Sequence, residues 1–110
     1  MLKPVRWLAD SRKVVRGFSL AGRRRCGQEL FRLQAGASPL DYKPMRSIGT
    51  GASEIRIHAG NEYRVIYIAK FAEAVYVLHA FTKKSQATSL HDVRLAQQRY
   101  QEMERARKKT

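Results

Sequence analysis

The chain has 110 residues, enough for one domain with a modest core, and 44% of them are hydrophobic, which excludes wholesale disorder. It carries 22 lysines and arginines against 9 acidic residues, and the net charge of +13 favours a polyanionic partner: a nucleic acid, an anionic membrane surface or an acidic protein. The single cysteine, Cys26, excludes an intramolecular disulfide and a cysteine-based zinc site, and we expect it to be a small core residue.

The first third of the chain predicts a short strand followed by two helices. Residues 3–8 have the composition of a strand. Asp10 or Ser11 is a suitable N-cap for a first short helix. Ser19 is placed to cap a second helix, and Gly36 suits the position just after its end.

The middle of the chain predicts an antiparallel meander. Residues 37–44 are polar, contain two prolines and are expected to form a loop. Residues 54–58 alternate between polar and apolar, which indicates a strand with one open face. A tight turn at Gly60 leads into residues 62–69, and residues 74–81 follow as another central strand.

The last segment predicts a helix that starts with a capping box formed by Ser89 and Asp92. Its apolar stripe consists of Val93, Ala96, Tyr100 and Met103. Residues 105–110 are expected to be a basic, frayed tail. The element order β-α-α-β-β-β-α over residues 1–110 predicts a single α+β domain, with helices packed on a twisted antiparallel sheet.

The candidate site is a cluster of cations on the sheet. Arg56 and Arg64 lie on neighbouring predicted strands, and Lys83 and Lys84 end the third, so the meander can bring all four together. Cations fixed around a phosphodiester stabilise the charge that develops when it is cleaved, and the 2′-hydroxyl of RNA can itself be the nucleophile. The candidates for proton transfer are Glu54, Tyr63, His79 and His91.

Structural interpretations compete with this one. Alternating basic residues are also typical of a solvated sheet face, and the two lysines can be a simple charge pair at a strand end. Arg64 interrupts an apolar strand, so Glu54 or Glu62 can serve as its structural counter-ion. His79 is more often a hydrogen-bonded core histidine than a base. The sequence shows no standard catalytic motif and no metal-ligand spacing, and we expect neither a metal nor another cofactor.

Several short motifs occur in an order that resembles the RelE/ParE superfamily of bacterial toxins, in particular its HigB-type, phage-derived branch. The most specific is the Phe-x-Lys-Lys run after a hydrophobic strand, followed by Tyr-Arg-Val-Ile-Tyr. The ordered set is Lys43-Pro-Met-Arg46, Gly49, Glu54-Ile-Arg-Ile57, Tyr63-Arg-Val-Ile-Tyr67, Ala74-Val-Tyr-Val-Leu-His79 and Phe81-Thr-Lys-Lys84. The resemblance runs from about Val5 to Tyr100 and implies a RelE-like fold.

The resemblance also implies an activity, because RelE- and HigB-like toxins cleave mRNA in the ribosomal A site without a metal. Arg64 matches the arginine of the Tyr-Arg-x-x-Tyr segment, and Lys83 or Lys84 matches the family's basic residue after the last strand. By this resemblance Arg64 and Lys84 hold the phosphate, and Arg56, at the position of a sheet lysine, assists the 2′-hydroxyl attack.

Two positions depart from the pattern of RelE. Glu54 stands where RelE has a second lysine, and the tyrosine that RelE carries after its basic run has no counterpart here. His91 is the candidate to replace that tyrosine. Because the same scaffold serves the ParE branch, which poisons DNA gyrase and cleaves nothing, a non-enzymatic toxin stays open as an alternative. A basic nucleic-acid-binding protein without toxicity is a third possibility.

The expected partners follow from the same resemblance. They are the ribosome with its mRNA and a helix-turn-helix antitoxin encoded nearby. The candidate RNA or ribosome contacts are Lys43, Arg46, Arg23, Arg24 and Arg25. The three consecutive arginines also suit a solvated helix face or a docking face for an acidic protein. No apolar stretch is long enough to span a bilayer and residues 1–10 lack an apolar signal region, so we expect a cytoplasmic protein without membrane contact.

Overall fold

A computed structural model describes residues 1–109, within which the chain forms five strands and three helices. In chain order the elements are β1 (Val5–Trp7), α1 (Ser11–Arg16), α2 (Leu20–Gln34), β2 (Tyr42–Pro44), β3 (Ala52–Ala59), β4 (Asn61–Ile68), β5 (Val75–Thr82) and α3 (Leu90–Lys108). The predicted α+β class is confirmed. The loop predicted at residues 37–44 is wrong at its end, where β2 adds a short edge strand to the meander.

The five strands form one sheet in the order β1-β5-β4-β3-β2. The predicted meander is present, because β2, β3, β4 and β5 pair antiparallel with their neighbours. The remaining pair is parallel, with Val5 of β1 opposite Val75 of β5. The sheet is therefore mixed rather than antiparallel throughout. A parallel pair needs a long crossover, and here the two first helices and most of the meander provide it.

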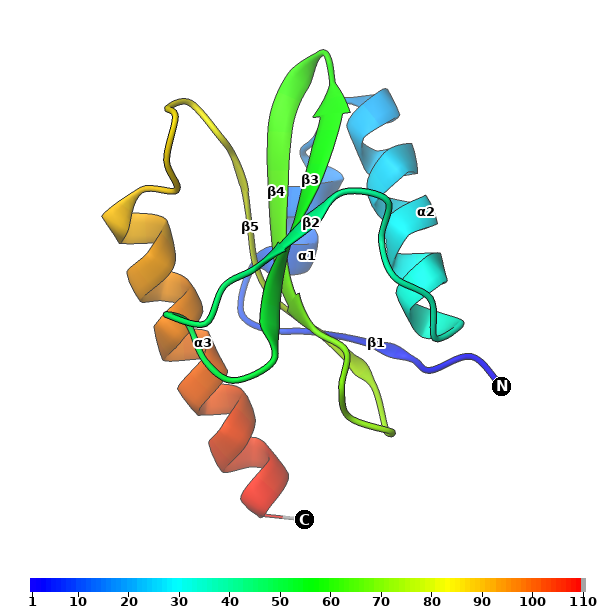
Figure 1. Cartoon of the computed structure of the whole chain (residues 1–110), viewed down its shortest axis with the longest axis vertical. Coiled ribbons are helices and arrows are strands. Elements are labelled where there is room, and N and C mark those ends of the chain that lie inside the picture. The colour runs from blue at the N-terminus through cyan, green and yellow to red at the C-terminus, as the bar shows by residue number, and fades with distance from the viewer. Residues whose placement is uncertain (110) are drawn as a thin grey trace.

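Helices cover both faces of the sheet, and this explains why β4 is apolar on both sides. On one face, here called the α2 face, Ile55, Ile57 and Val65 pack against α1 and α2. On the other, the α3 face, Ile66 and Leu78 pack against α3. Figure 1 shows α2 and α3 on opposite sides of the sheet. In β3 and β4 the buried odd-numbered residues belong to the first core and the buried even-numbered residues to the second. In β5 an irregularity opposite Ile66 and Tyr67 reverses this order, so that Ala80 lies in the first core and Phe81 in the second.

The predicted helix ends are confirmed where a specific hydrogen bond defines them. Ser19 Oγ accepts from the Gly22 amide at 3.0 Å, and Ser89 Oγ accepts from the Asp92 amide at 3.1 Å. At the end of α2, Gly36 adopts a φ of +85°, which closes the helix in a left-handed conformation that glycine adopts at little cost.

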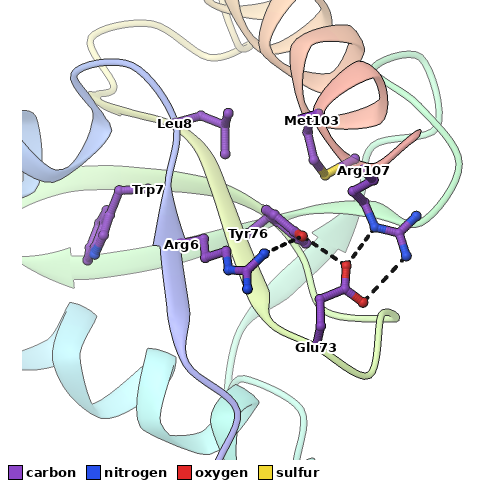
Figure 2. Close-up of a pocket in the computed structure, with 8 residues that line it drawn as sticks. Arg6, Trp7, Leu8, Glu73, Tyr76, Met103 and Arg107 are labelled. Atoms are coloured by element: carbon purple, nitrogen blue, oxygen red, sulfur yellow. Dashed lines mark hydrogen bonds and ion pairs between the residues drawn. The ribbon is translucent and has the colours of Figure 1, made fainter. Parts of the chain in front are cut away.

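The C-terminal end of α3 differs from the frayed tail predicted from residue 105. The helix continues to Lys108, because Arg107 Nε donates to Glu73 Oε2 at 2.6 Å and Tyr76 donates its hydroxyl to the same oxygen at 2.8 Å. Arg107 holds the pKa of Glu73 at about 2. Figure 2 shows this group beside β1, where Arg6 Nη1 donates to the Tyr76 hydroxyl at 3.3 Å. Residue 110 lies outside the described part of the chain.

Two glycines of α2 occupy contrasting environments. A Cβ atom on Gly22 would stand 2.5 Å from Cε2 of Tyr63, so the helix approaches β4 closely at this point. The Tyr63 ring is held by stacking on Phe18, with ring centroids 4.1 Å apart. A Cβ atom on Gly27 would meet no other heavy atom of residues 1–109 within 4 Å.

We predict opposite effects for the two alanine substitutions. Gly22→Ala should lower the free energy of unfolding by about 1 kcal/mol or more, because overpacking against the fixed Tyr63 ring outweighs the gain in helix propensity. Gly27→Ala should raise it by about 0.5–1 kcal/mol through helix propensity alone. Urea denaturation followed by circular dichroism measures both, and equal shifts of the same sign would contradict this packing.

Candidate functional site

The sheet register brings the predicted cations together. Arg56 of β3 lies directly opposite Arg64 of β4, so both belong to the α3 face. The Lys83 amide donates to the Glu62 carbonyl at 2.7 Å. This hydrogen bond holds the segment after β5 beside the first residues of β4. A depression of about 650 Å³ results, and it brings Arg64 together with both lysines, whereas Arg56 is not among its lining residues. These are Glu62, Arg64, Lys83, Lys84, Ser85 and Gln86.

Arg64 is only 5% exposed and is held by two carboxylates. Its Nη1 and Nη2 donate to Glu62 Oε1 at 3.3 Å, and Nη1 donates to the Tyr63 carbonyl at 2.9 Å. Its Nε lies 3.7 Å from Glu54 Oε1, an ion pair that is too long for a hydrogen bond. The structural interpretation of Arg64 is therefore confirmed, with both suggested counter-ions in place. The guanidinium still lines the depression and is fixed before any ligand arrives.

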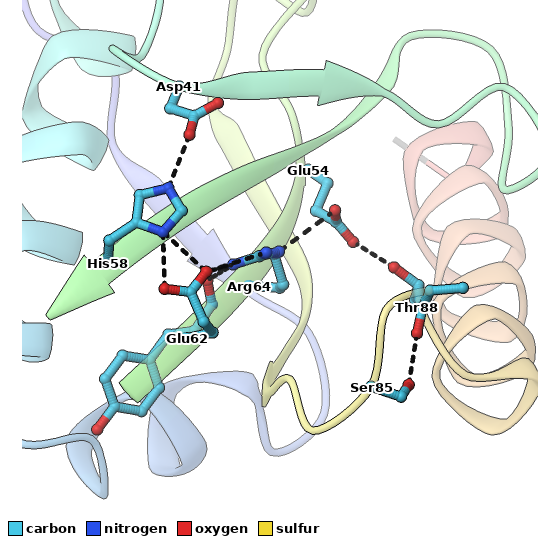
Figure 3. A network of polar contacts seen from close by, with 9 residues as sticks. Asp41, Glu54, His58, Glu62, Arg64, Ser85 and Thr88 are labelled. Atoms are coloured by element: carbon cyan, nitrogen blue, oxygen red, sulfur yellow. Dashed lines mark hydrogen bonds and ion pairs between the residues drawn. The ribbon is translucent and has the colours of Figure 1, made fainter. Parts of the chain in front are cut away.

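Glu54, one of the proton-transfer candidates, is buried and engaged by two partners. Its side chain is 2% exposed, one oxygen faces Arg64, and the other accepts from Thr88 Oγ1 at 2.8 Å. Thr88 belongs to the segment that leads into α3, so this segment covers the carboxylate. Figure 3 shows the chain of contacts from Thr88 through Glu54 to Arg64.

The same chain of contacts continues to His58, which the sequence places with Arg56 on the polar side of one strand but which was not among the candidates for proton transfer. His58 Nδ1 lies 2.7 Å from both carboxyl oxygens of Glu62, and Nε2 lies 2.8 Å from Asp41 Oδ2 (Figure 3). Hydrogen bonds to Asp41 and then to Glu62 raise the pKa of His58. The side chain is 53% exposed and shares the face of Arg56 and Arg64. The alternation Glu54, Arg56, His58 in β3 was the signal that placed it there.

Tyr63, another proton-transfer candidate, lies on the α2 face and not beside the cations. Strand alternation turns it away from its neighbour Arg64 and buries it, 3% exposed, against Phe18. Its hydroxyl accepts from the Ser19 amide at 3.1 Å and from Asn61 Nδ2 at 3.4 Å. Tyr63 therefore joins the start of α2 to the sheet.

His79 is a core histidine, as the structural interpretation held. Arg99 Nη1 donates to His79 Nδ1 at 2.8 Å, so Nε2 carries the proton and donates to Asp92 Oδ1 at 2.7 Å. Arg99 Nη2 in turn donates to Asp10 Oδ1 at 2.9 Å. Burial lowers the pKa of His79, and the charge of Arg99 acts in the same direction. Both ring nitrogens are occupied, so His79 cannot also transfer a proton to a substrate.

The remaining candidates lie at separate places. His91 is exposed in the first turn of α3. Lys43 is exposed on β2 opposite Glu54, while Arg46 lines a different depression of about 490 Å³ with residues 50–53. The arginines at positions 23, 24 and 25 lie on α2, on the far side of the sheet from Arg64. The suggested RNA contacts therefore do not form one continuous surface.

Cys26 is fully buried, as expected, and burial raises the pKa of its thiol to about 12. Within residues 1–109, no group of three or more histidine, cysteine, aspartate and glutamate side chains is arranged to hold a metal ion. Across the same residues, no helix combines the length and the apolar character needed to cross a membrane.

The small α+β fold, with helices on both faces of a mixed sheet, is consistent with a RelE-like fold. The chain belongs to the family described as Phage derived protein Gp49-like (DUF891), a phage-derived family of RelE-like toxins; the match covers residues 13–101. These residues include all four cations of the candidate site. No curated protein matches the chain.

The two perturbed histidines predict opposite pH dependences of stability. Because the pKa of His79 is lower in the folded chain than in the unfolded chain, the unfolded chain is protonated at a higher pH as the pH falls. The free energy of unfolding therefore decreases as the pH drops below the unfolded pKa of about 6.5. The raised pKa of His58 supplies stability below about 6.5 that is lost as the pH rises through its folded pKa.

A His58→Gln variant isolates the contribution of His79. We expect its free energy of unfolding, measured in urea, to fall between about pH 7.5 and about pH 5.5. The control is the His58→Gln/His79→Gln double variant, which should lose most of this dependence. Equal stability of the single variant at both pH values would contradict the arrangement of His79 between Asp92 and Arg99.

Proposed function

We propose that the protein is the toxin of a type II toxin–antitoxin system, of HigB type, and that it is a ribosome-dependent endoribonuclease. The observation that carries this proposal is the meeting of Arg64, Lys83 and Lys84 in one open depression. Three cations around a space of this kind suit the binding of a single RNA phosphate. Membership of a phage-derived toxin family supports the toxic role, and a ribosomal target places the reaction in the cytoplasm.

The proposed reaction divides the cations by their mobility. Arg64 is a fixed charge at the floor, while the partly exposed Lys83 and the exposed Lys84 close on the phosphate from the rim. The 2′-oxygen attacks phosphorus and the bond to the 5′-oxygen breaks, which leaves a 2′,3′-cyclic phosphate and a free 5′-hydroxyl. Arg56 lies beside Arg64 and stabilises the attacking oxygen as its proton leaves.

Two proton transfers complete this reaction, one from the 2′-hydroxyl and one to the 5′-oxygen. With Glu54, Tyr63 and His79 committed elsewhere, we assign these transfers to His58 and His91, which are both exposed. His58 is the stronger candidate, because Glu62 contacts both its ring and the guanidinium of Arg64. A protonated His58 is a suitable acid for the leaving oxygen.

The proposed partners are the ribosome with its mRNA and a helix-turn-helix antitoxin encoded beside the gene. The net charge of +13 suits association with ribosomal RNA and neutralisation by an acidic protein. A short reading frame for a helix-turn-helix protein next to the gene is the observation that checks the second partner.

We predict that Lys83→Ala/Lys84→Ala abolishes growth arrest and lowers mRNA cleavage by about 100-fold or more, because it removes the mobile half of the phosphate site. The measurement is growth after induction, together with mapping of mRNA ends in translated regions. The matched control is Lys108→Ala/Lys109→Ala, which removes the same charge at the C-terminal end of α3, a helix about 27 Å long, and should stay toxic.

These lysines make a cleaner test than Arg64, whose reversal to glutamate would place a third carboxylate beside Glu54 and Glu62 and threaten the fold. Full toxicity of a folded Lys83→Ala/Lys84→Ala protein would show that the site is misplaced. Inhibition of gyrase supercoiling with intact mRNA would instead establish a ParE-like toxin.

A further inference from the structure

The layer formed by α1 and α2 carries an unbalanced positive charge. These two helices contain seven basic residues and one acidic residue, Glu29, which is only 2% exposed. The basic residues are Arg12, Lys13, Arg16, Arg23, Arg24, Arg25 and Arg32. None of the seven forms an ion pair within the described residues 1–109. On the other side of the sheet, by contrast, Arg64, Arg99 and Arg107 are each paired with a carboxylate.

An apolar groove lies within this charged layer. It has a volume of about 520 Å³ and is formed by α2 and the loop that follows it. Phe31 is 55% exposed and Leu40 is 67% exposed at its edges. The lining residues of this α2 groove are Gly27, Gln28, Glu29, Phe31, Arg32 and Leu40. Of the seven cations, Arg32 lines the groove itself. Apolar side chains gathered in a groove with polar neighbours are typical of an interaction site.

Hydrogen bonds hold the groove in shape. The Leu40 amide donates to Glu29 Oε2 at 2.6 Å, and Arg32 Nε donates to the Ser38 carbonyl at 2.9 Å. Both bonds tie the loop to α2. Because these bonds already fix the loop in the unbound protein, the loop loses little conformational freedom when a ligand binds, and this favours affinity.

Gly27 forms part of the groove without a visible structural reason. A Cβ atom there would meet no other heavy atom of residues 1–109 within 4 Å, and glycine in the middle of a helix costs about 0.5–1 kcal/mol relative to alanine. The absence of a side chain leaves the helix backbone open to close approach from outside. A ligand that packs directly on α2 accounts for the glycine.

We propose that the α2 groove binds an acidic segment of a partner protein, which inserts an apolar side chain between Phe31 and Leu40 above Gly27. The seven unpaired cations complement acidic residues on such a segment. The exposed Leu40 favours a protein over a nucleic acid, because bases stack on aromatic rings such as Phe31 but make no comparable contact with an aliphatic side chain. The proposal does not depend on the nuclease reaction, whose cations lie on the α3 face.

The test uses the full-length protein and a fluorescein-labelled peptide of about 16 residues, with leucines every third or fourth position and glutamates on the remaining face. We expect Gly27→Arg to weaken binding about tenfold or more, measured by fluorescence anisotropy, because it fills the groove. The control Ala21→Arg adds the same charge at an exposed position of the same helix and should stay within about twofold.

The Gly27→Arg result separates shape from charge, since the added positive charge by itself would strengthen binding to an acidic peptide. Phe31→Ala should weaken binding similarly and keeps the helix intact. Equal affinities of Gly27→Arg and Ala21→Arg would overturn the proposal, as would equal binding of a permuted peptide with the same composition. Weaker binding of a single-stranded RNA probe in Gly27→Arg, with peptide binding unchanged, would assign the layer to nucleic acid and would also overturn it.

Discussion

The burial of Arg64 is the constraint on which the candidate site depends. A guanidinium is always charged, so placing it at 5% exposure requires carboxylates close by, and Glu54 and Glu62 supply them. Each carboxylate has a second partner, because Glu54 accepts from Thr88 and Glu62 contacts His58. One buried cation thus connects β3, β4 and the segment that leads into α3, and it holds the rim of the depression in place.

The two faces of the sheet divide the positive charge in different ways. On the α3 face Arg64, Arg99 and Arg107 are each paired with a carboxylate, and the free charge in the depression comes from the two lysines after β5. On the α2 face the helices carry cations that form no ion pair within the described residues, and α2 also bears an apolar groove. A small basic protein can in this way offer one surface to a phosphate and another to a protein, with the sheet between them.

Local pattern was sufficient for most elements of the fold. Helix spacing and the capping residues Ser19 and Ser89 located α2 and α3, and strand alternation located β3. The errors occurred where pairing with distant residues decided the outcome. β2 is a strand only because it pairs with β3, and the last turn of α3 is ordered because Arg107 reaches Glu73. Neither contact has a signature in the local sequence.

The charge of +13 and the parity of the cations in β3 and β4 follow from the sequence alone, because side chains alternate with period two along a regular strand. Parity does not say which helix covers which face. Only the tertiary structure buried Glu54 and His79, turned Tyr63 away from Arg64, and left His58 exposed beside the site. The physical reason is that a polar group's availability depends on its hydrogen-bond partners, and here the decisive ones come from other elements, often far away along the chain.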